Sequence, residues 1–220
     1  MKIFLPVLLS AILLAGCNNN NKVVIKGAFT APAEGVVYLD QSEVDRSIRV
    51  DSAEIRRGRF KFVAEISGPE FFQVRFPGNE FVALLVMPGE DISLELGKAP
   101  VAMNYTVQGS PGSSDIRMLD QQLLVTRGRL DSLRTIYTSL SSDELALRGP
   151  ELEKAYTDAV EAQRKFNIKF VIENISSMSS IQALYQRLDE NTYVLYQPRD
   201  LQYLKIVSDS LSVRYPVSRH

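Results

Sequence analysis

Short runs of alternating apolar and polar residues fill the first half of the chain, from Val23 to Gln108. Phe60 and Phe62, for example, alternate with charged residues. A period of two is typical of antiparallel strands that turn one face towards a core. Turn-forming residues such as Gly58 and Pro88-Gly89 separate the runs, about every ten residues. This half therefore predicts an antiparallel β-sandwich of about eight strands, or a partly open barrel.

The predicted strands differ in how much of each is expected to be buried. The apolar positions Ile48 and Val50 are expected to lie on a half-buried strand, and the run 81–87 is expected to be buried on both faces. The expected core phenylalanines, packed rather than stacked on a ligand, are Phe60, Phe62, Phe72, Phe76 and Phe81. The strands are predicted around residues 23–25, 36–39, 48–50, 60–66, 72–76, 81–87, 92–96 and 105–107.

After residue 110 the apolar spacing changes to three and four, which is the period of a helix. Ser113 is expected to cap the first helix, Ser141-Ser142-Asp143 to end it, and Gly149-Pro150 to mark a further boundary. Two helices with a short connection pack most simply as an antiparallel hairpin. The same stripes could form a dimer seam, but the intramolecular seam is favoured because the partner helix is adjacent in sequence. The stripes consist of Ile116, Leu119, Leu123, Thr126, Leu130, Leu133, Tyr137 and Leu140, then Leu152, Tyr156, Ala159, Gln163, Phe166 and Phe170.

Two shorter helices are predicted to follow. Ser179 and Gln182 have the spacing of a capping box, and Pro198–Asp200 starts a last helix that ends near Tyr215-Pro216. The chain is thus predicted to be an α+β protein. Its β-sandwich domain covers residues 23–109, and an α-helical hairpin or bundle region covers residues 110–220.

The N-terminal residues have the pattern of an export signal. A basic start precedes a 12-residue, mostly apolar run at 3–14, which is too short for a membrane span of about 20 residues. Leu14-Ala15-Gly16-Cys17 then has the form of a lipobox, rather than of a core helix or a plain secretory signal with an incidental cysteine. We expect a signal peptide at 1–16, lipidation of Cys17 and a polar tether at 17–22. The asparagines that follow Cys17 favour the outer membrane, facing the periplasm, over surface export.

Composition excludes several classes of function. The formal net charge is −1, whereas nucleic-acid binding needs a clustered basic excess, so no nucleic-acid partner is expected. Cys17 and His220 are the only cysteine and histidine, which argues against a redox pair, a catalytic triad and a His/Cys zinc site. The basic residues of the first half are expected to be solvated strand and turn positions: Lys22, Lys26, Arg56, Arg57, Arg59 and Lys61.

The remaining candidate chemistry lies in a few acids and serines. A hydrolase would need two carboxylates that converge, and we expect turn roles for these acids instead. The serines lack a neighbouring Gly-rich loop with lysine or a histidine base, so helix capping is expected. No catalytic, cofactor-binding or metal-binding residue is therefore predicted. The residues considered are Asp40, Asp45, Asp51, Glu90, Asp91, Ser110, Ser113 and Ser114.

An ordered set of short motifs resembles a known family. Val50-Asp51-Ser52, residues 58–62, residues 69–72, Pro88-Gly89-Glu90 and residues 105–110 (Tyr-x-Val-x-Gly-Ser) occur in the order of the N-terminal domain of unknown function 4369 of Bacteroidota cell-envelope lipoproteins. Residues 170–174 and 211–216 resemble the helical segment that follows that domain. In many members a thioredoxin-like disulfide reductase domain with a Cys-x-x-Cys site comes next. The resemblance implies an envelope location, but this sequence has no reactive cysteine pair.

These observations lead to two expectations about function. The first is a lipid-anchored cell-envelope protein with a binding or scaffolding role, no cofactor and no catalytic site of its own. Its partners would be the membrane, through the lipid on Cys17, and a protein or a second copy, through the helices. The alternative is a truncated thioredoxin-like thiol-disulfide oxidoreductase family member, involved in envelope redox chemistry or cytochrome maturation.

Overall fold

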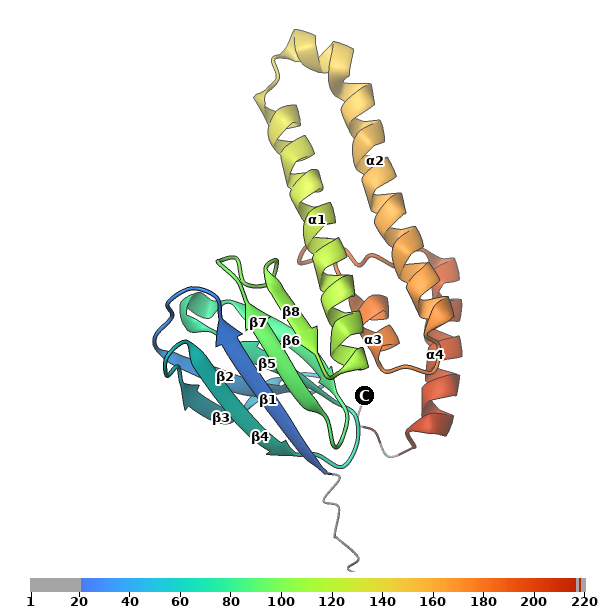
Figure 1. The fold of residues 1–220 in the computed structure, drawn as a ribbon. Coiled ribbons are helices and arrows are strands. Elements are labelled where there is room, and N and C mark those ends of the chain that lie inside the picture. Colours follow the sequence, from blue (N-terminus) through green and yellow to red (C-terminus); the bar gives the residue numbers. More distant parts are fainter. Residues whose placement is uncertain (1–20, 217, 219–220) are drawn as a thin grey trace, which may run out of the picture.

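The computed structural model describes residues 21–216 and 218, and it has the predicted α+β architecture (Figure 1). Eight strands come first and four α-helices follow, with one 3-10 helix in each half. The strands are β1 (Lys22–Phe29), β2 (Val36–Ser42), β3 (Ser47–Glu54), β4 (Arg59–Glu65), β5 (Glu70–Arg75), β6 (Phe81–Val86), β7 (Asp91–Leu96) and β8 (Tyr105–Gln108). The helices are η1 (Pro77–Asn79), α1 (Pro111–Ser139), α2 (Ser142–Glu173), α3 (Ser179–Tyr185), η2 (Pro198–Asp200) and α4 (Leu201–Arg214).

The strands form two four-stranded sheets that face each other. Their orders are β4-β1-β7-β8 and β3-β2-β5-β6. All the pairings are antiparallel except that between β1 and β7, which is parallel. A parallel pair needs a crossover connection. Here the chain passes from β1 to β7 through β4 of the same sheet and the four strands of the other sheet. The predicted β-sandwich is thus confirmed.

The sandwich core follows from the alternation along each strand. On β4, Phe60 and Phe62 are buried while Arg59 and Lys61 are exposed. Phe60 lies among other rings, with centroids 5.6 Å from Phe62 and 6.2 Å from Phe76. The prediction was wrong for Phe81, which remains 43% exposed at the first position of β6.

Strand β6 is the point at which the sandwich meets the helices. Val82, Leu84 and Val86 belong to the core between the sheets, whereas Leu85 packs with Ile116 and Leu119 of α1 in a second apolar cluster. Burial on both faces, which was predicted for residues 81–87, is found only at Val82 and residues 84–86, because Ala83 and Met87 are partly buried. Phe81 points to the outer face at the end of the strand, where the guanidinium of Arg75 lies 5.6 Å from its ring centroid.

Strand β3 departs from the predicted half-buried pattern. Ile48 and Val50 are 38% and 46% exposed. The strand pairs only with β2, and its register shifts between Leu39 and Asp40, which leaves Val50 without a partner residue. An edge position with a bulge explains both the exposure and the break in alternation.

The first two helices form an antiparallel hairpin that extends beyond the sandwich (Figure 1). Helix α2 begins at a capping box between Ser141 and Glu144, so the boundary predicted at Gly149-Pro150 was wrong. Pro150 lies inside α2, and Figure 1 shows that the helix is bent near its start. A proline in a helix interior removes a hydrogen bond and bends the helix without necessarily ending it.

The last helices cover the base of the hairpin. Helix α3 does begin at Ser179, but Met178 is its N-cap residue and no side chain caps it, so the predicted capping box was wrong. The Ser179 hydroxyl instead donates to Asp115 Oδ2 at 3.0 Å, which ties α3 to α1. Helix α4 buries Val207 and Leu211. None of the described helices is long and apolar enough to cross a membrane.

Candidate functional site

The predicted lipidation residue, Cys17, lies outside the described residues, and so does His220. The first residue of β1 is Lys22, and the carbonyl of Asn21 accepts a hydrogen bond from the Ile66 amide at 2.9 Å. Whether Cys17 is lipidated therefore stays a prediction. The geometry of the described residues fixes where the chain enters the sandwich, at the open ends of β1 and β4.

The candidate acids do not converge on one site. Asp40 is buried and its carboxylate lies 3.1 Å from Arg49 and 3.1 Å from Arg75, so it is a structural ion-pair residue. The side chain of Asp51 accepts the amide of Ser52, and Glu90 accepts the amide of Met87. Asp91 pairs with Lys26, while Asp45 is an exposed turn residue. Among the described residues, no group of three or more His, Cys, Asp or Glu side chains could hold a metal ion.

The serines beside the break at 109–113 join the sandwich to α1. Ser110, not Ser113 as predicted, is the N-cap residue, and its hydroxyl accepts the Ser113 amide at 3.2 Å. The hydroxyls of Ser110 and Ser113 also lie 3.0 and 2.9 Å from the carbonyl oxygen of Leu85 on β6. Gly112 permits this approach, because a Cβ there would lie 3.0 Å from Leu85 atoms. Sequence reasoning assigned the serines to capping but missed their contact with a sheet edge.

A chain of buried polar side chains connects three helices. The Thr126 hydroxyl donates to Gln163 Oε1 at 2.5 Å, and the amide nitrogen of Gln163 donates to Asn167 Oδ1 at 2.8 Å. Asn167 then donates to the Ala183 carbonyl and to Gln186 Oε1, at 2.8 and 2.9 Å. Throughout the described part of the chain, no buried side-chain nitrogen or oxygen lacks a partner. A fully paired network of this kind fixes the register of α1, α2 and α3.

Asp120 ends this network on α1. Its Oδ1 atom accepts hydrogen bonds from Gln182 at 2.9 Å and from Gln186 at 3.3 Å. Burial raises the pKa of Asp120 above its ordinary value of 3.8, and the two amide hydrogen bonds and the charge of Arg127 oppose that shift only in part. The shift of this carboxylate therefore has a structural explanation in helix packing.

A buried ion pair fastens the start of α4 to α2. Arg164 and Asp200 are 5% and 2% exposed, and two guanidinium nitrogens donate to the two carboxylate oxygens of Asp200. Burial alone would raise the pKa of Asp200. The hydrogen bonds from Arg164 and from the Gln197 amide outweigh burial and hold the pKa below 3.8. The pair is satisfied within the chain and faces no cavity that the structure describes.

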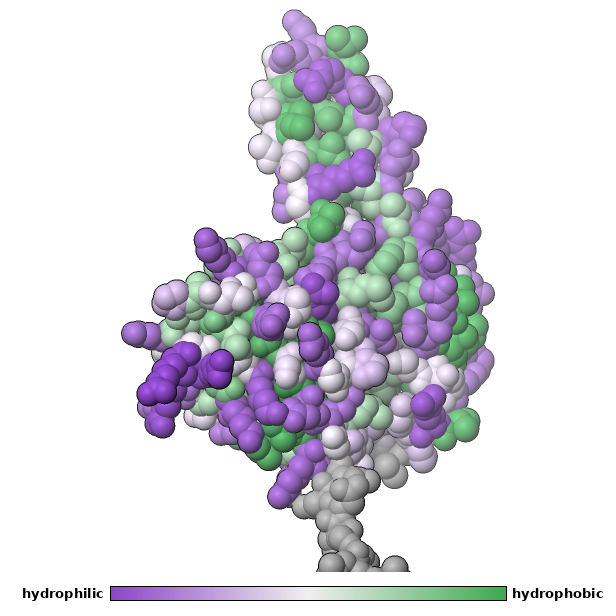
Figure 2. All heavy atoms as spheres, viewed as in Figure 1, coloured by the Kyte–Doolittle hydropathy of each residue, from purple (hydrophilic) through white to green (hydrophobic). Residues whose placement is uncertain are grey.

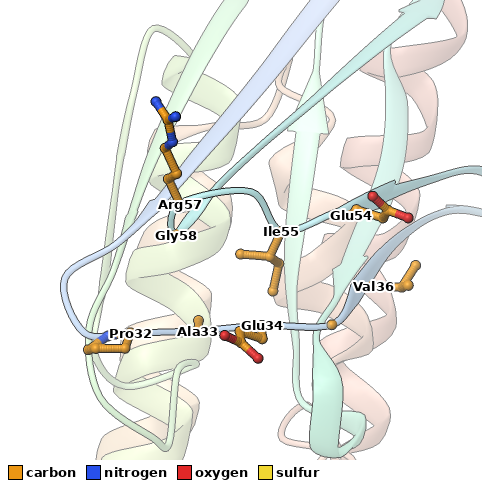
Figure 3. Close-up of a pocket in the computed structure, with 9 residues that line it drawn as sticks. Pro32, Ala33, Glu34, Val36, Glu54, Ile55, Arg57 and Gly58 are labelled. Atoms are coloured by element: carbon orange, nitrogen blue, oxygen red, sulfur yellow. The ribbon is translucent and has the colours of Figure 1, made fainter.

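A hollow of about 590 Å3 lies at the corner between β2, β3 and β4 (Figure 3). Ala33 and Ile55 form its apolar part. The charged side chains of Glu34, Glu54 and Arg57 point in different directions, away from a common centre. The corner therefore brings no charged groups together for catalysis.

A second hollow, of about 460 Å3, lies between α1 and α2 in the part of the hairpin that extends past the sandwich. Leu133, Tyr137, Leu152 and Tyr156 supply its apolar surface. Nearby at the hairpin tip, Ile136 and Leu147 are 38% and 83% exposed. We call residues 129–158 the hairpin arm. Sequence periodicity identified the apolar stripe that lines this hollow, the groove of the hairpin arm. It did not show that the outer end of the groove is open to solvent.

The comparisons with known proteins identify the first half of the chain. A search of curated proteins finds no match. A family model described as "Domain of unknown function (DUF4369)" matches residues 23–115, which span the whole sandwich and the first turn of α1. The match agrees with the motifs singled out in the sequence, from Val50-Asp51-Ser52 to Tyr105 and Ser110. The β-sandwich of this protein therefore matches the DUF4369 family model over its whole length.

Proposed function

We propose that this protein is a lipid-anchored component of the cell envelope that binds a partner and has no catalytic site of its own. The observation that carries the proposal is the hairpin arm, which extends past the sandwich and exposes a groove and apolar side chains (Figure 1). Ile136 and Leu147 lie there without a neighbouring helix to cover them. Exposed apolar surface on a rigid element is typical of protein interaction sites.

Attachment through lipid on Cys17 is supported by the lipobox and by the position of β1. Lys22 follows Cys17 by 22 − 17 = 5 residues, which span at most ~17 Å when extended. One acyl chain binds a bilayer only marginally, so stable attachment needs the several chains of a fully modified lipoprotein cysteine. A tether this short would hold the sandwich close to the bilayer surface. The proposed location is the outer membrane, facing the periplasm.

Substitution of the lipidation residue tests the anchor. Cys17→Ser should move the protein from the membrane fraction to the soluble fraction of the envelope, and the neighbouring Asn19→Ser variant should stay with the membrane. A Cys17→Ser protein that remained membrane-bound would contradict the anchor. Activity is tested separately: purified mature protein should not reduce insulin disulfides, and reduction without an added thioredoxin would contradict a purely binding role.

The binding role of the hairpin arm is tested by sedimentation and by substitution at its tip. If the partner is a second copy, the mature chain should sediment as a dimer at roughly tens of micromolar, and Ile136→Asp with Leu147→Asp should convert it to a monomer. If the partner is another protein, a photo-crosslinker at Tyr137 should give a product in cells that the same tip substitutions remove. A crosslinker at the exposed Tyr185 serves as the control. A monomer whose Tyr137 product is unchanged by the substitutions would contradict a role for the arm.

The alternative proposal is a thiol-disulfide oxidoreductase of the envelope. The match of the sandwich to the DUF4369 family model favours this alternative only because the sequence resembles reductase lipoproteins that begin with such a domain. The DNA that follows the codon of His220 tests it. A downstream Cys-x-x-Cys segment in another frame would support this alternative, and its absence would leave the binding role.

A further inference from the structure

The outer face of the sheet β4-β1-β7-β8 collects basic residues that are far apart in sequence. Strand β1 pairs with β4, which places Lys26 directly opposite Lys61 and Ala28 opposite Arg59. Like charges directly opposite each other on a sheet are destabilising. Figure 2 views this face and shows strongly hydrophilic side chains gathered near the β3–β4 corner. We call the outer face of β1 and β4, together with Arg57 of the adjoining β3–β4 turn, the basic stripe: Lys22, Lys26, Arg57, Arg59 and Lys61.

Much of the positive charge on the basic stripe is not neutralised. Lys26 pairs with Asp91 at 2.6 Å, and Lys22 lies 3.9 Å from Glu65. Arg57, Arg59 and Lys61 are exposed, and within the part of the chain that the structure describes they make no ion pair within 4.0 Å. The third arginine of the corner, Arg56, is paired with Glu54. Fields from unpaired cations on a flat face attract an anionic surface.

The face also has an apolar patch beside these cations. Val24 on β1 lies opposite Val63 on β4, and Val63 is 49% exposed. The two valines lie between the pair Lys22–Glu65 and the cations Lys26 and Lys61 in the register of the two strands. Apolar side chains bordered by lysine and arginine are typical of surfaces that contact the headgroup region of a bilayer.

The tether enters the sandwich at the strand end where the basic stripe begins. Lys22 is both the first residue of β1 and a member of the basic stripe. From Lys22 to Ala28 the stripe extends about 20 Å along the strand, comparable to the reach of the five residues after Cys17. Attachment at Cys17 would thus hold this end of the sandwich, and with it the start of the basic stripe, close to the bilayer.

We propose that the basic stripe and Val63 contact the anionic phospholipid headgroups of the membrane to which lipid on Cys17 attaches the protein. This rests on the proposed lipid anchor for proximity, but the surface chemistry is independent of it. Figure 1 looks onto the same face of the sheet and shows the hairpin extending in the plane of the picture. With the sheet on the membrane, the hairpin arm runs along the bilayer, where it meets partners close to the membrane surface.

Vesicle binding tests the surface without the anchor. The chain from residue 17 to 220, with Cys17→Ser, is sedimented with vesicles of phosphatidylcholine, with or without phosphatidylglycerol. We expect binding only to the anionic vesicles, weakened by salt. Each lysine or arginine near an anionic surface strengthens binding about five-fold, so Arg57→Gln, Arg59→Gln and Lys61→Gln together should weaken it about 100-fold.

A matched triple variant controls for net charge. Lys165→Gln, Arg199→Gln and Arg214→Gln remove the same charge from exposed positions on α2, η2 and α4, outside the hairpin arm, and should change binding much less. Equal losses in the two triple variants would overturn the proposal, as would no binding to anionic vesicles at millimolar lipid. If the first triple variant did not fold, Lys61→Gln alone should still weaken binding about five-fold. Because Cys17 is absent, these results are independent of lipidation in cells.

A single tryptophan tests the orientation. The chain contains no tryptophan, so Val63→Trp introduces a unique fluorophore on the proposed contact face. Brominated anionic lipid should quench its emission. Quenching should be weak for Tyr196→Trp, at a 51% exposed position in the helical region. Equal quenching of the two variants would overturn the orientation even if the protein bound the vesicles.

Discussion

The buried pair between Arg164 and Asp200 gives a prediction whose size follows from its surroundings. Breaking a buried ion pair by removing one partner costs about 3–5 kcal/mol, because the other charge stays buried without compensation. After Asp200→Asn, Arg164 still has Glu161 at 3.5 Å, so we expect a loss near the lower limit, about 3 kcal/mol. Arg164→Met leaves the carboxylate with the Gln197 amide at 2.9 Å and should lower the free energy of unfolding by a similar amount.

Urea denaturation of the mature chain measures these losses. The loss of unfolding free energy in the double variant should be smaller than the sum of the two single losses by at least about 2 kcal/mol, because removing both partners leaves no unpaired charge. The exposed pair Lys205–Asp209, at 2.8 Å, is the control, and its substitution should leave the unfolding midpoint unchanged. Single losses below about 1 kcal/mol, or strictly additive losses, would refute the reasoning.

The same pair has a predicted pH dependence. Because the pKa of Asp200 in the folded protein lies below 3.8, its contribution is present above pH 3.8. It is lost as the pH falls through the lower value in the folded state. Acid titration of stability should therefore be shallower in Asp200→Asn than in the wild-type protein. If the free energy of unfolding fell equally steeply with acid in the two proteins, Arg164 would not be holding this carboxylate ionised.

Three further predictions concern single residues. Asp120→Asn keeps the acceptor for Gln182 and Gln186 and removes a buried charge, so it should raise the free energy of unfolding at pH 7, as measured by urea unfolding. Because the pKa of Asp120 is raised in the folded protein, this gain should vanish below pH 3.8. Lys61→Gln removes the repulsion from Lys26 and should stabilise the protein by about 0.5 kcal/mol; a loss of thermal stability would contradict this. Pro150→Ala should stabilise the start of α2 by up to about 3 kcal/mol, and unchanged amide hydrogen exchange there would contradict it.

The sandwich could be predicted because the alternation of apolar residues reports directly on burial. All eight predicted strands are present, and the apolar positions of β4 are buried as expected. The exceptions lie where burial depends on position in the sheet. Ile48 and Val50 alternate correctly, but β3 is an edge strand with a bulge, and Phe81 lies beyond the cover that α1 gives to β6.

The helix boundaries were less predictable because several residues compete for the same role. Ser110 and Ser113 are both good N-cap residues, and only the position of the β6 edge decides between them. Pro150 usually indicates a boundary, but the capping box at Ser141 and Glu144 starts the helix earlier. The polar positions Thr126 and Gln163 look like gaps in the apolar stripes, and the structure joins them by a hydrogen bond.

The surface features depend on pairing, which a single sequence does not reveal. The basic residues were expected to be solvated, and they are exposed. Lys26 and Lys61 are 35 positions apart, and only the pairing of β1 with β4 places them side by side. The open end of the hairpin arm likewise follows from the short α3, which covers only the base of the hairpin.

The chemical state of Cys17 is the most direct test of the central claim, which is attachment by lipid. The measurement is the intact mass of the protein extracted from membranes of a host that processes lipoproteins. We predict a chain that begins at Cys17 and carries the added mass of a diacylglyceryl group and an N-acyl chain. A mature protein that begins at another residue, or that has an unmodified Cys17 thiol, would contradict the account.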